Sequence, residues 1–93
     1  MIRSFADAET EQLFVTGKAR RLSPAILKRA AMRLIQLHAA VRLSDLRLPR
    51  SNHLEALKGD RAGQYSIRIN DQWRVCFRFA EGDAFDVEIT DYH

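Results

Sequence analysis

The stretch that decides the fold runs from Tyr65 to Thr90 and reads YSIRINDQWRVCFRFAEGDAFDVEIT. Apolar side chains occupy every second position in three successive runs, and polar or charged side chains fill the positions between them. This period of two predicts β-strands that each have one apolar face and one polar face. Polar turns at Asn70–Asp71 and Glu81–Asp83 separate the runs, which predicts a three-stranded antiparallel meander. Its expected core face carries Tyr65, Ile67, Ile69, Trp73, Val75, Phe77, Phe79, Phe85, Val87 and Ile89.

Two helices are expected before this meander. The first covers residues 7–16 and ends at Gly17, a residue that often terminates helices. The second covers residues 24–40, because Ser23–Pro24 is typical of a helix start. Spacings of three and four predict an apolar stripe made of Leu27, Ala30, Leu34, Leu37 and Val41. The positions expected outside this stripe are Lys28, Arg29, Arg33 and Gln36.

The remaining segments complete the expected architecture. Residues 2–5 are a candidate first strand, Ser44–Leu46 is a candidate short helical turn, and residues 54–63 are expected to form an ordered loop. Because the meander has an apolar face that only the two helices can cover, the fold class is α+β. We expect one domain over residues 1–93, with two N-terminal helices packed on a twisted antiparallel sheet in the order β-α-α-β-β-β.

Composition narrows the class of protein. With 93 residues, the chain can build only one small core, so we expect a functional site on an open surface. Its one cysteine, Cys76, excludes an internal disulfide and a zinc site built from cysteines. The sequence has neither a signal peptide nor an apolar run long enough to cross a membrane. These features predict a soluble cytoplasmic protein without a membrane partner.

The formal net charge of +3 hides a strong asymmetry along the chain. Residues 1–17 sum to −2, residues 18–78 to +10 and residues 81–91 to −5. The basic central segment contains mostly arginine, whose planar guanidinium suits phosphate groups. A polyanionic partner such as a nucleic acid is therefore one interpretation. The alternative is a solvated basic surface.

Three arginines fall on the expected polar face of the sheet: Arg68, Arg74 and Arg78. Together they could bind two or three phosphates. The alternative is that they form ordinary cross-strand ion pairs with Asp86 and Glu88.

The last three residues, Asp91-Tyr92-His93, follow directly on the last expected strand. They offer a carboxylate, a phenol and an imidazole that titrates near neutral pH. The other histidines, His38 and His53, form no metal-ligand spacing with His93, and we expect no metal site. A chance tail is the alternative interpretation of this trio.

Three stretches together resemble one known family. They are Leu57–Arg61 (LKGDR), Tyr65–Asn70 (YSIRIN) followed by Gln72–Arg74 (QWR), and the terminal trio Asp91-Tyr92-His93. In this order, over essentially the whole chain, they resemble the HigB toxins of the RelE/ParE superfamily. The resemblance implies the same α+β fold.

The resemblance also implies an activity and partners. HigB toxins cleave messenger RNA in the ribosomal A site without a metal or other cofactor. A HigA-type antitoxin with a helix-turn-helix DNA-binding domain neutralises them, and contact with operator DNA is made through that antitoxin. The implied function is therefore a metal-independent endoribonuclease of a type II toxin–antitoxin system, in which the ribose 2′-OH attacks the adjacent phosphate.

Carried onto this chain, the resemblance implies a set of site residues. The catalytic candidates are Lys58, Arg74, Asp91, Tyr92 and His93. The substrate-binding candidates are Arg61, Arg68, Arg78 and Glu55. Glu55 stands where some relatives have a histidine, so the role of that histidine cannot be transferred.

The implied roles follow from the chemistry of each group. Lys58 and Arg74 would stabilise charge on the phosphorane, and Tyr92 would stack on or orient a base. Asp91 and His93 form the proton-transfer pair, with Glu55 as a further candidate base.

Two other functions are compatible with the same sequence. One is a ParE-like inhibitor of DNA gyrase, which would need no ribonuclease chemistry. The other is a basic nucleic-acid-binding module, whose affinity would fall steeply with salt. The gyrase inhibitor would keep its toxicity after substitution of Lys58, Tyr92 or His93 by alanine, and the binding module would cleave no RNA.

Overall fold

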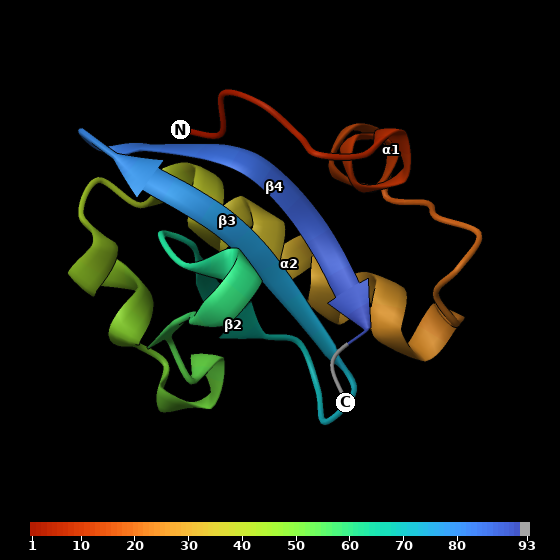
Figure 1. The fold of residues 1–93 in the computed structure, drawn as a ribbon. Helices are drawn as coiled ribbons and strands as arrows, with labels where there is room; N and C mark the ends of the chain where they lie inside the picture. Colours follow the sequence, from red (N-terminus) through yellow and green to blue (C-terminus); the bar gives the residue numbers. More distant parts are fainter. Residues whose placement is uncertain (92–93) are drawn as a thin grey trace.

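The computed structural model describes residues 1–91 as two helices and an antiparallel four-stranded sheet. The helices are α1 (Ala8–Thr16) and α2 (Pro24–Ala39), and the strands are β1 (Glu55–Ala56), β2 (Tyr65–Arg68), β3 (Trp73–Ala80) and β4 (Asp83–Asp91). Short 3₁₀ segments are η1 (Leu43–Arg47), η2 (Arg50–Asn52) and η3 (Gly59–Arg61). The sheet order is β1-β2-β3-β4. Figure 1 shows α2 crossing one face of the sheet and α1 lying beside β4. The predicted α+β class is confirmed.

The core lies between α2 and the face of the sheet predicted to be apolar. Fully buried residues include Leu34 and Leu37 from α2 and Ile67, Val75 and Phe77 from the strands. The apolar stripe of α2 and the apolar faces of the strands therefore pack against each other in one core, as expected for amphipathic elements. The opposite face of the sheet, which we call the outer face, lies away from α2 (Figure 1) and carries the polar side chains of the strands.

A β-bulge corrects the predicted pattern in β4. Cys76 pairs with Glu88 but Arg78 pairs with Phe85, so β4 carries one extra residue at this point. Asp86 adopts a φ of 53° there. The extra residue reverses the alternation. Phe85 therefore shares the outer face with Arg78 and is only partly buried, although the sequence places it in the core.

The first predicted strand is reduced to two isolated parallel bridges, Ile2 with Ala84 and Phe5 with Val87. Its backbone still satisfies the free edge of β4: Arg3 N–H donates to the Ala84 carbonyl at 2.7 Å and Ala6 N–H to the Val87 carbonyl at 2.9 Å. Figure 1 shows this segment running along β4. The sequence also misses β1, whose two residues lie inside the predicted loop and are too few to show a period.

Both helices lie within about one residue of their predicted bounds. The predicted burial of Val41 and the predicted exposure of Arg33 are wrong. The Asp7 side chain accepts a hydrogen bond from Thr10 N–H at 2.7 Å, and Gly17 ends α1 with a φ of 79°. Ser23 precedes α2 without a side-chain cap bond. Val41 is 70% exposed because α2 ends two residues before it. Arg33, predicted outside the buried stripe, is instead 9% exposed.

No helix within residues 1–91 is long and apolar enough to span a membrane.

Thr10 attaches α1 to the sheet through a buried hydroxyl. Its Oγ1 accepts a hydrogen bond from Ile89 N–H at 3.1 Å, and Thr10 is 1% exposed. We expect Thr10→Val to lower the free energy of unfolding by about 1–3 kcal/mol, because the Ile89 N–H is left buried without an acceptor. Denaturant unfolding checks this. Thr10→Ser is the matched control, since it keeps the hydroxyl; equal stability of the two variants would contradict the assignment.

Candidate functional site

The outer face of the sheet carries two rows of side chains in register. One row contains Glu55, Ser66, Cys76 and Glu88, one residue from each strand in order. The next row contains Arg68, Arg74 and Thr90 from the last three strands. Ser66 and Cys76 are buried although they lie on the face away from the helices. Charged side chains therefore cover the middle of the outer face.

Arg74 is the best-fixed cation of this surface. Its side chain is 13% exposed, and its Nη1 donates to Ser66 Oγ at 2.8 Å and to the His53 carbonyl at 3.2 Å. The same nitrogen lies 3.7 Å from Glu55 Oε1. Glu55, one of the predicted substrate-binding residues, thus lies directly beside a predicted catalytic residue. The side chain of Ser66 holds Arg74 in place, a role that sequence reasoning missed.

Arg61 reaches the outer face from η3. Its Nη1 donates to Glu88 Oε1 at 2.7 Å and to Gln64 Oε1 at 2.9 Å. The hydrogen bond to Glu88 holds the pKa of the Arg61 guanidinium above its ordinary value. Glu88 therefore pairs with Arg61, a residue 27 positions away in sequence, rather than with the strand arginines.

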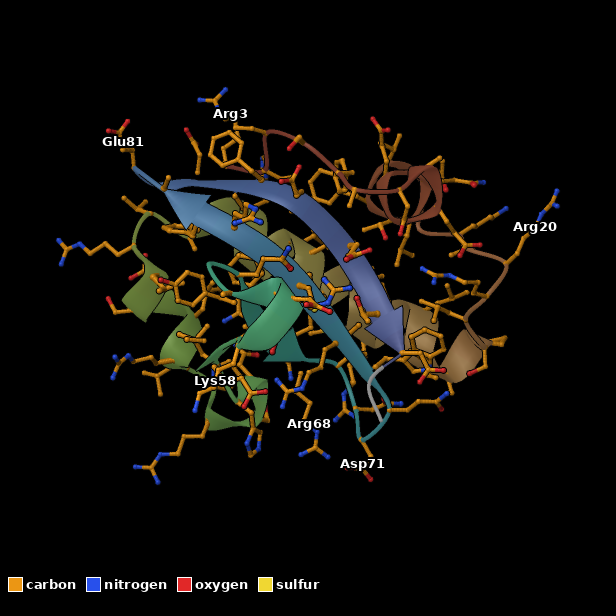
Figure 2. All side chains as sticks on the ribbon, in the orientation of Figure 1. Arg3, Arg20, Lys58, Arg68, Asp71 and Glu81 are labelled. Atoms are coloured by element: carbon orange, nitrogen blue, oxygen red, sulfur yellow. The ribbon has the colours of Figure 1, made fainter. Side chains whose placement is uncertain are left out.

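Lys58 lies at the start of η3, where Gly59 turns the chain with a φ of 65°. It is exposed and lines a shallow hollow of about 340 Å³ together with Glu55 and Arg61. Within residues 1–91, Lys58 makes no ion pair. Figure 2 shows Lys58 and Arg68 projecting from the same side of the molecule. The ammonium group is therefore available to an anion that enters this hollow.

The other two strand arginines have local partners. Arg78 Nε lies 3.5 Å from Asp86 Oδ2, so the cross-strand ion pair considered as an alternative is what the structure contains at this position. Arg68 Nη2 pairs with Asp71 in the β2–β3 turn. Both pairs are substantially exposed and easily exchanged for another anion, because exposed ion pairs contribute only about 0–1 kcal/mol.

Asp91 lies apart from this cluster. It pairs in register with Trp73, which faces the core, whereas Arg74 faces outward. By alternation, Asp91 shares the face of Trp73. Its Oδ2 accepts a hydrogen bond from Gln72 Nε2 at 3.2 Å. The predicted catalytic residues Tyr92 and His93 lie outside the described residues. The structure thus brings together Lys58, Glu55, Arg61 and Arg74, with Arg68 in the same row as Arg74.

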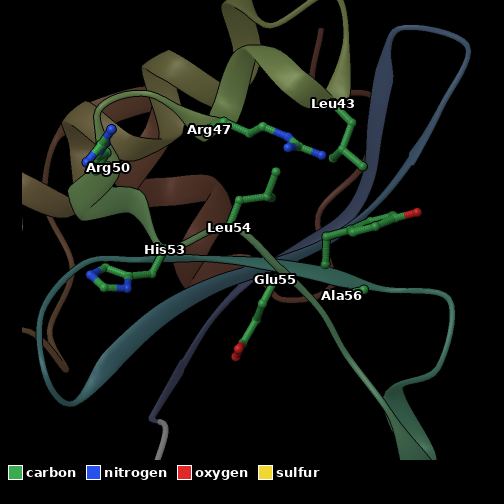
Figure 3. A pocket seen from close by; sticks show the side chains of 8 residues that line it. Leu43, Arg47, Arg50, His53, Leu54, Glu55 and Ala56 are labelled. Atoms are coloured by element: carbon green, nitrogen blue, oxygen red, sulfur yellow. The ribbon is translucent and has the colours of Figure 1, made fainter.

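A second hollow, of about 430 Å³, lies on the other side of β1. Leu43, Leu54 and Tyr65 give it apolar walls, and Arg47 and Arg50 line it with positive charge. Figure 3 shows Glu55 pointing away from Arg47 and Leu43. Strand β1 therefore separates this hollow from the one that contains Lys58. Within residues 1–91, no group of three His, Cys, Asp or Glu side chains is arranged to hold a metal ion.

Comparison with known proteins assigns the chain to a family. The sequence model of the HigB-like toxins, described as the RelE-like toxin of the type II toxin–antitoxin system HigB, matches residues 3–93. The chain belongs to the HigB-like toxin family. As a HigB-like toxin of a type II system, it has an antitoxin as its partner.

Individual relatives agree with this assignment. The HigB-like chain is 38% identical over 87 residues to Toxin HigB-1 of Vibrio cholerae, covering 92% of each sequence. It is 33% identical over 93 residues to Endoribonuclease HigB of Proteus vulgaris, covering all of both. A crystal structure of a YafQ mutant from E. coli superposes with a TM-score of 0.65 at 11% identity, covering 98% of this chain and 93% of that one. At that identity, the superposition supports the fold.

The reactivity of the Cys76 thiol reports whether the row that contains Ser66 and Cys76 is buried beneath the charged side chains. Burial raises the pKa of this thiol above its ordinary value, so less of it is thiolate at any given pH than in a free cysteine. We expect the folded protein to react slowly with a thiol-specific disulfide reagent at mildly alkaline pH. In guanidinium chloride the reaction should reach the rate of a model thiol. Fast labelling of the native protein would show that the charged layer does not cover this row.

Proposed function

We propose that this HigB-like toxin is a ribosome-dependent endoribonuclease that cleaves messenger RNA in the A site. The observation that carries the proposal is the position of Lys58, exposed in a hollow that Arg61 and Glu55 also line. Glu55 in turn lies against the firmly held Arg74. Such a concentration of fixed and exposed cations on an open surface suits a phosphodiester. The Proteus vulgaris relative that bears the name endoribonuclease supports the same activity.

In the proposed reaction the nucleophile is the ribose 2′-OH of the RNA itself. The protein supplies the base, the acid and the cations. A base removes the proton of the ribose 2′-OH, and the oxygen attacks the adjacent phosphorus. The bond from phosphorus to the 5′ oxygen breaks, and an acid protonates that oxygen. The products are a 2′,3′-cyclic phosphate and a 5′-hydroxyl. Lys58 and Arg74 stabilise the charge that develops on the phosphorane, with Arg61, Arg68 and Arg78 as further phosphate contacts.

Proton transfer is proposed for Glu55, Asp91 and His93. Among residues 1–91, Glu55 lies 3.7 Å from Arg74 Nη1, with its carboxylate about half exposed. Glu55 is a candidate base because its carboxylate lies next to Arg74 and lines the same hollow as Lys58. Tyr92 is proposed to orient the base of the cleaved nucleotide by stacking.

The proposed partners follow from this activity. The ribosome aligns messenger RNA against the outer face of the sheet, so free RNA is a poor substrate. The antitoxin is of the HigA type with a helix-turn-helix domain, and operator DNA is contacted through it.

Primer extension on messenger RNA in a reconstituted translation reaction tests the activity. We expect wild type to cut within codons only when ribosomes are present. Lys58→Ala should lower cleavage about 10²–10³-fold, the usual effect of losing one charge-stabilising donor. His93→Ala should lower it about 10²–10⁴-fold, as expected for an acid or base.

Arg20→Gln is the matched control for these losses of charge, because Arg20 is exposed and Figure 2 places it far from Lys58. Inhibition of translation or growth without any cleavage would overturn the ribonuclease proposal in favour of gyrase inhibition or simple binding.

Ser66→Ala tests the positioning of Arg74. Without the Ser66 hydroxyl, the Arg74 guanidinium loses its 2.8 Å hydrogen bond to Ser66 Oγ. We expect kcat for cleavage to fall roughly tenfold to hundredfold, because small misplacements of a catalytic group are costly, while KM changes little. Cys76→Ala, at the neighbouring position of the same buried row, is the matched control. Equal kcat values for the two variants would count against a positioning role.

A further inference from the structure

Arg33 is a buried cation for which residues 1–91 supply no acidic partner. It projects from α2 beneath the end of β2 and is 9% exposed. Its Nε donates to the Arg68 carbonyl at 2.9 Å, and its Nη2 donates to Ser51 Oγ at 3.3 Å. Within residues 1–91, no carboxylate forms a salt bridge with it. The guanidinium is therefore satisfied only by neutral oxygens.

Such an arrangement is costly in an isolated molecule. A buried charge is normally paired, because removal from water costs several kcal/mol. Arg29, one turn earlier on α2, adds electrostatic repulsion. Burial and, to a lesser extent, Arg29 lower the pKa of the Arg33 guanidinium from its ordinary value. An anion bound at this place would relieve both effects.

A hollow of about 230 Å³ opens where Arg33 reaches the surface. Arg29, Arg33 and Arg68 line it, together with the polar side chains of Ser51 and Asn70. Its acidic lining residue is Asp71, which pairs with Arg68 and has a side chain that is 95% exposed. The Asp71 carboxylate can swing into water at little cost and free the Arg68 fork.

We propose that this hollow is a phosphate-binding subsite that holds a backbone phosphodiester of RNA. Arg33 supplies a preorganised donor at its base, and Arg29 and Arg68 close on the phosphate oxygens from the rim. Arginine guanidinium groups bind phosphate oxygens in pairs of parallel hydrogen bonds, which an ammonium group cannot do. The Ser51 hydroxyl and the Asn70 amide add neutral contacts.

The position of the subsite argues for RNA rather than an acidic protein. Arg68 and Arg74 are direct cross-strand partners on β2 and β3, so the subsite adjoins the cluster proposed to hold the scissile phosphate. A single strand has a phosphate at every nucleotide, so a strand bound at Arg74 brings further phosphates to the neighbouring cations. The identity of the polyanion rests on the proposed function, whereas binding of phosphate itself does not.

Binding to a single-stranded oligoribonucleotide with 2′-O-methyl groups, which cannot be cleaved, tests the subsite directly. Fluorescence anisotropy at several salt concentrations gives the affinity and its salt dependence. We expect Arg29→Gln to weaken binding roughly three- to tenfold and to reduce the slope of log K against log salt by about 0.7, the value for one lost contact on a single strand. Arg20→Gln removes the same charge elsewhere and should change both quantities less.

Arg33→Lys provides a second variant that keeps the charge and loses the planar fork. Because Arg33 also ties α2 to β2, its thermal unfolding is measured beside its RNA affinity. A folded Arg33→Lys protein should bind the oligoribonucleotide as weakly as Arg29→Gln does. Wild-type affinity in a folded Arg33→Lys variant would overturn the assignment of Arg33 as the base of the subsite.

Two further measurements extend the test. Ribosome binding distinguishes messenger RNA from ribosomal RNA as the source of the phosphate, and a phosphate titration tests the subsite independently of the proposed function. If the phosphate belongs to ribosomal RNA, Arg29→Gln weakens binding to ribosomes without messenger RNA and leaves oligoribonucleotide binding unchanged. Titration of the protein with inorganic phosphate, followed by the NMR signal of Arg33 Nε–H, tests the subsite even if the protein cleaves no RNA. Unchanged affinity for oligoribonucleotide, ribosomes and inorganic phosphate in Arg29→Gln, relative to Arg20→Gln, overturns the proposal.

Discussion

The packing of α2 against the strands determines which surface of this small protein is available for chemistry. Leu34 and Leu37 meet Ile67, Val75 and Phe77, and this contact uses one whole face of the sheet. Within residues 1–91, no further helix or sheet packs on the other face. Charged side chains cover it instead, and they bury Ser66 and Cys76 in doing so. The candidate site is therefore a consequence of having a core on one side only.

Ion pairs between arginines and glutamates hold the side chains of this charged layer in place. Glu55 lies beside Arg74, and Glu88 lies beside Arg61, so two cations are held in place by carboxylates. Lys58 is exposed at the rim of the same surface and makes no ion pair within residues 1–91. A fixed guanidinium can orient a phosphate, whereas a flexible ammonium group can follow charge as it develops during a reaction. The two kinds of cation thus have complementary uses.

Sequence periodicity predicted most of the fold because its long elements repeat a simple pattern. The strands β2 and β3 and both helices lie where the spacing of apolar residues places them. The misses are local: one extra residue at Asp86 reverses the face of Phe85, and a two-residue strand at Glu55 has no period to detect. Arg33 looks like a surface residue in the helical pattern, yet the β2–β3 turn and η2 close over it.

The candidate site was predicted less completely, for a related reason. Arg68, Arg74 and Arg78 could be placed on the outer face from alternation alone. Their partners could not, because Glu55 and Arg61 come from a segment without periodicity, and the contact between Arg61 and Glu88 spans 27 positions. The supporting role of Ser66 depends on the same tertiary placement. Alternation specifies the face that a side chain occupies but not the neighbour that it meets.

The attachment of the N-terminal segment to β4 has a consequence for biosynthesis. Arg3, Ser4, Ala6 and Thr10 find hydrogen-bond partners between residues 84 and 89, almost the full length of the chain away. Contacts of such large sequence separation slow folding, because a long loop must close before they form. The segment before α1 therefore reaches its native pairing only after β4 has been synthesised. A nascent chain still being translated has no completed sheet edge, so the native fold forms only when synthesis of β4 is finished.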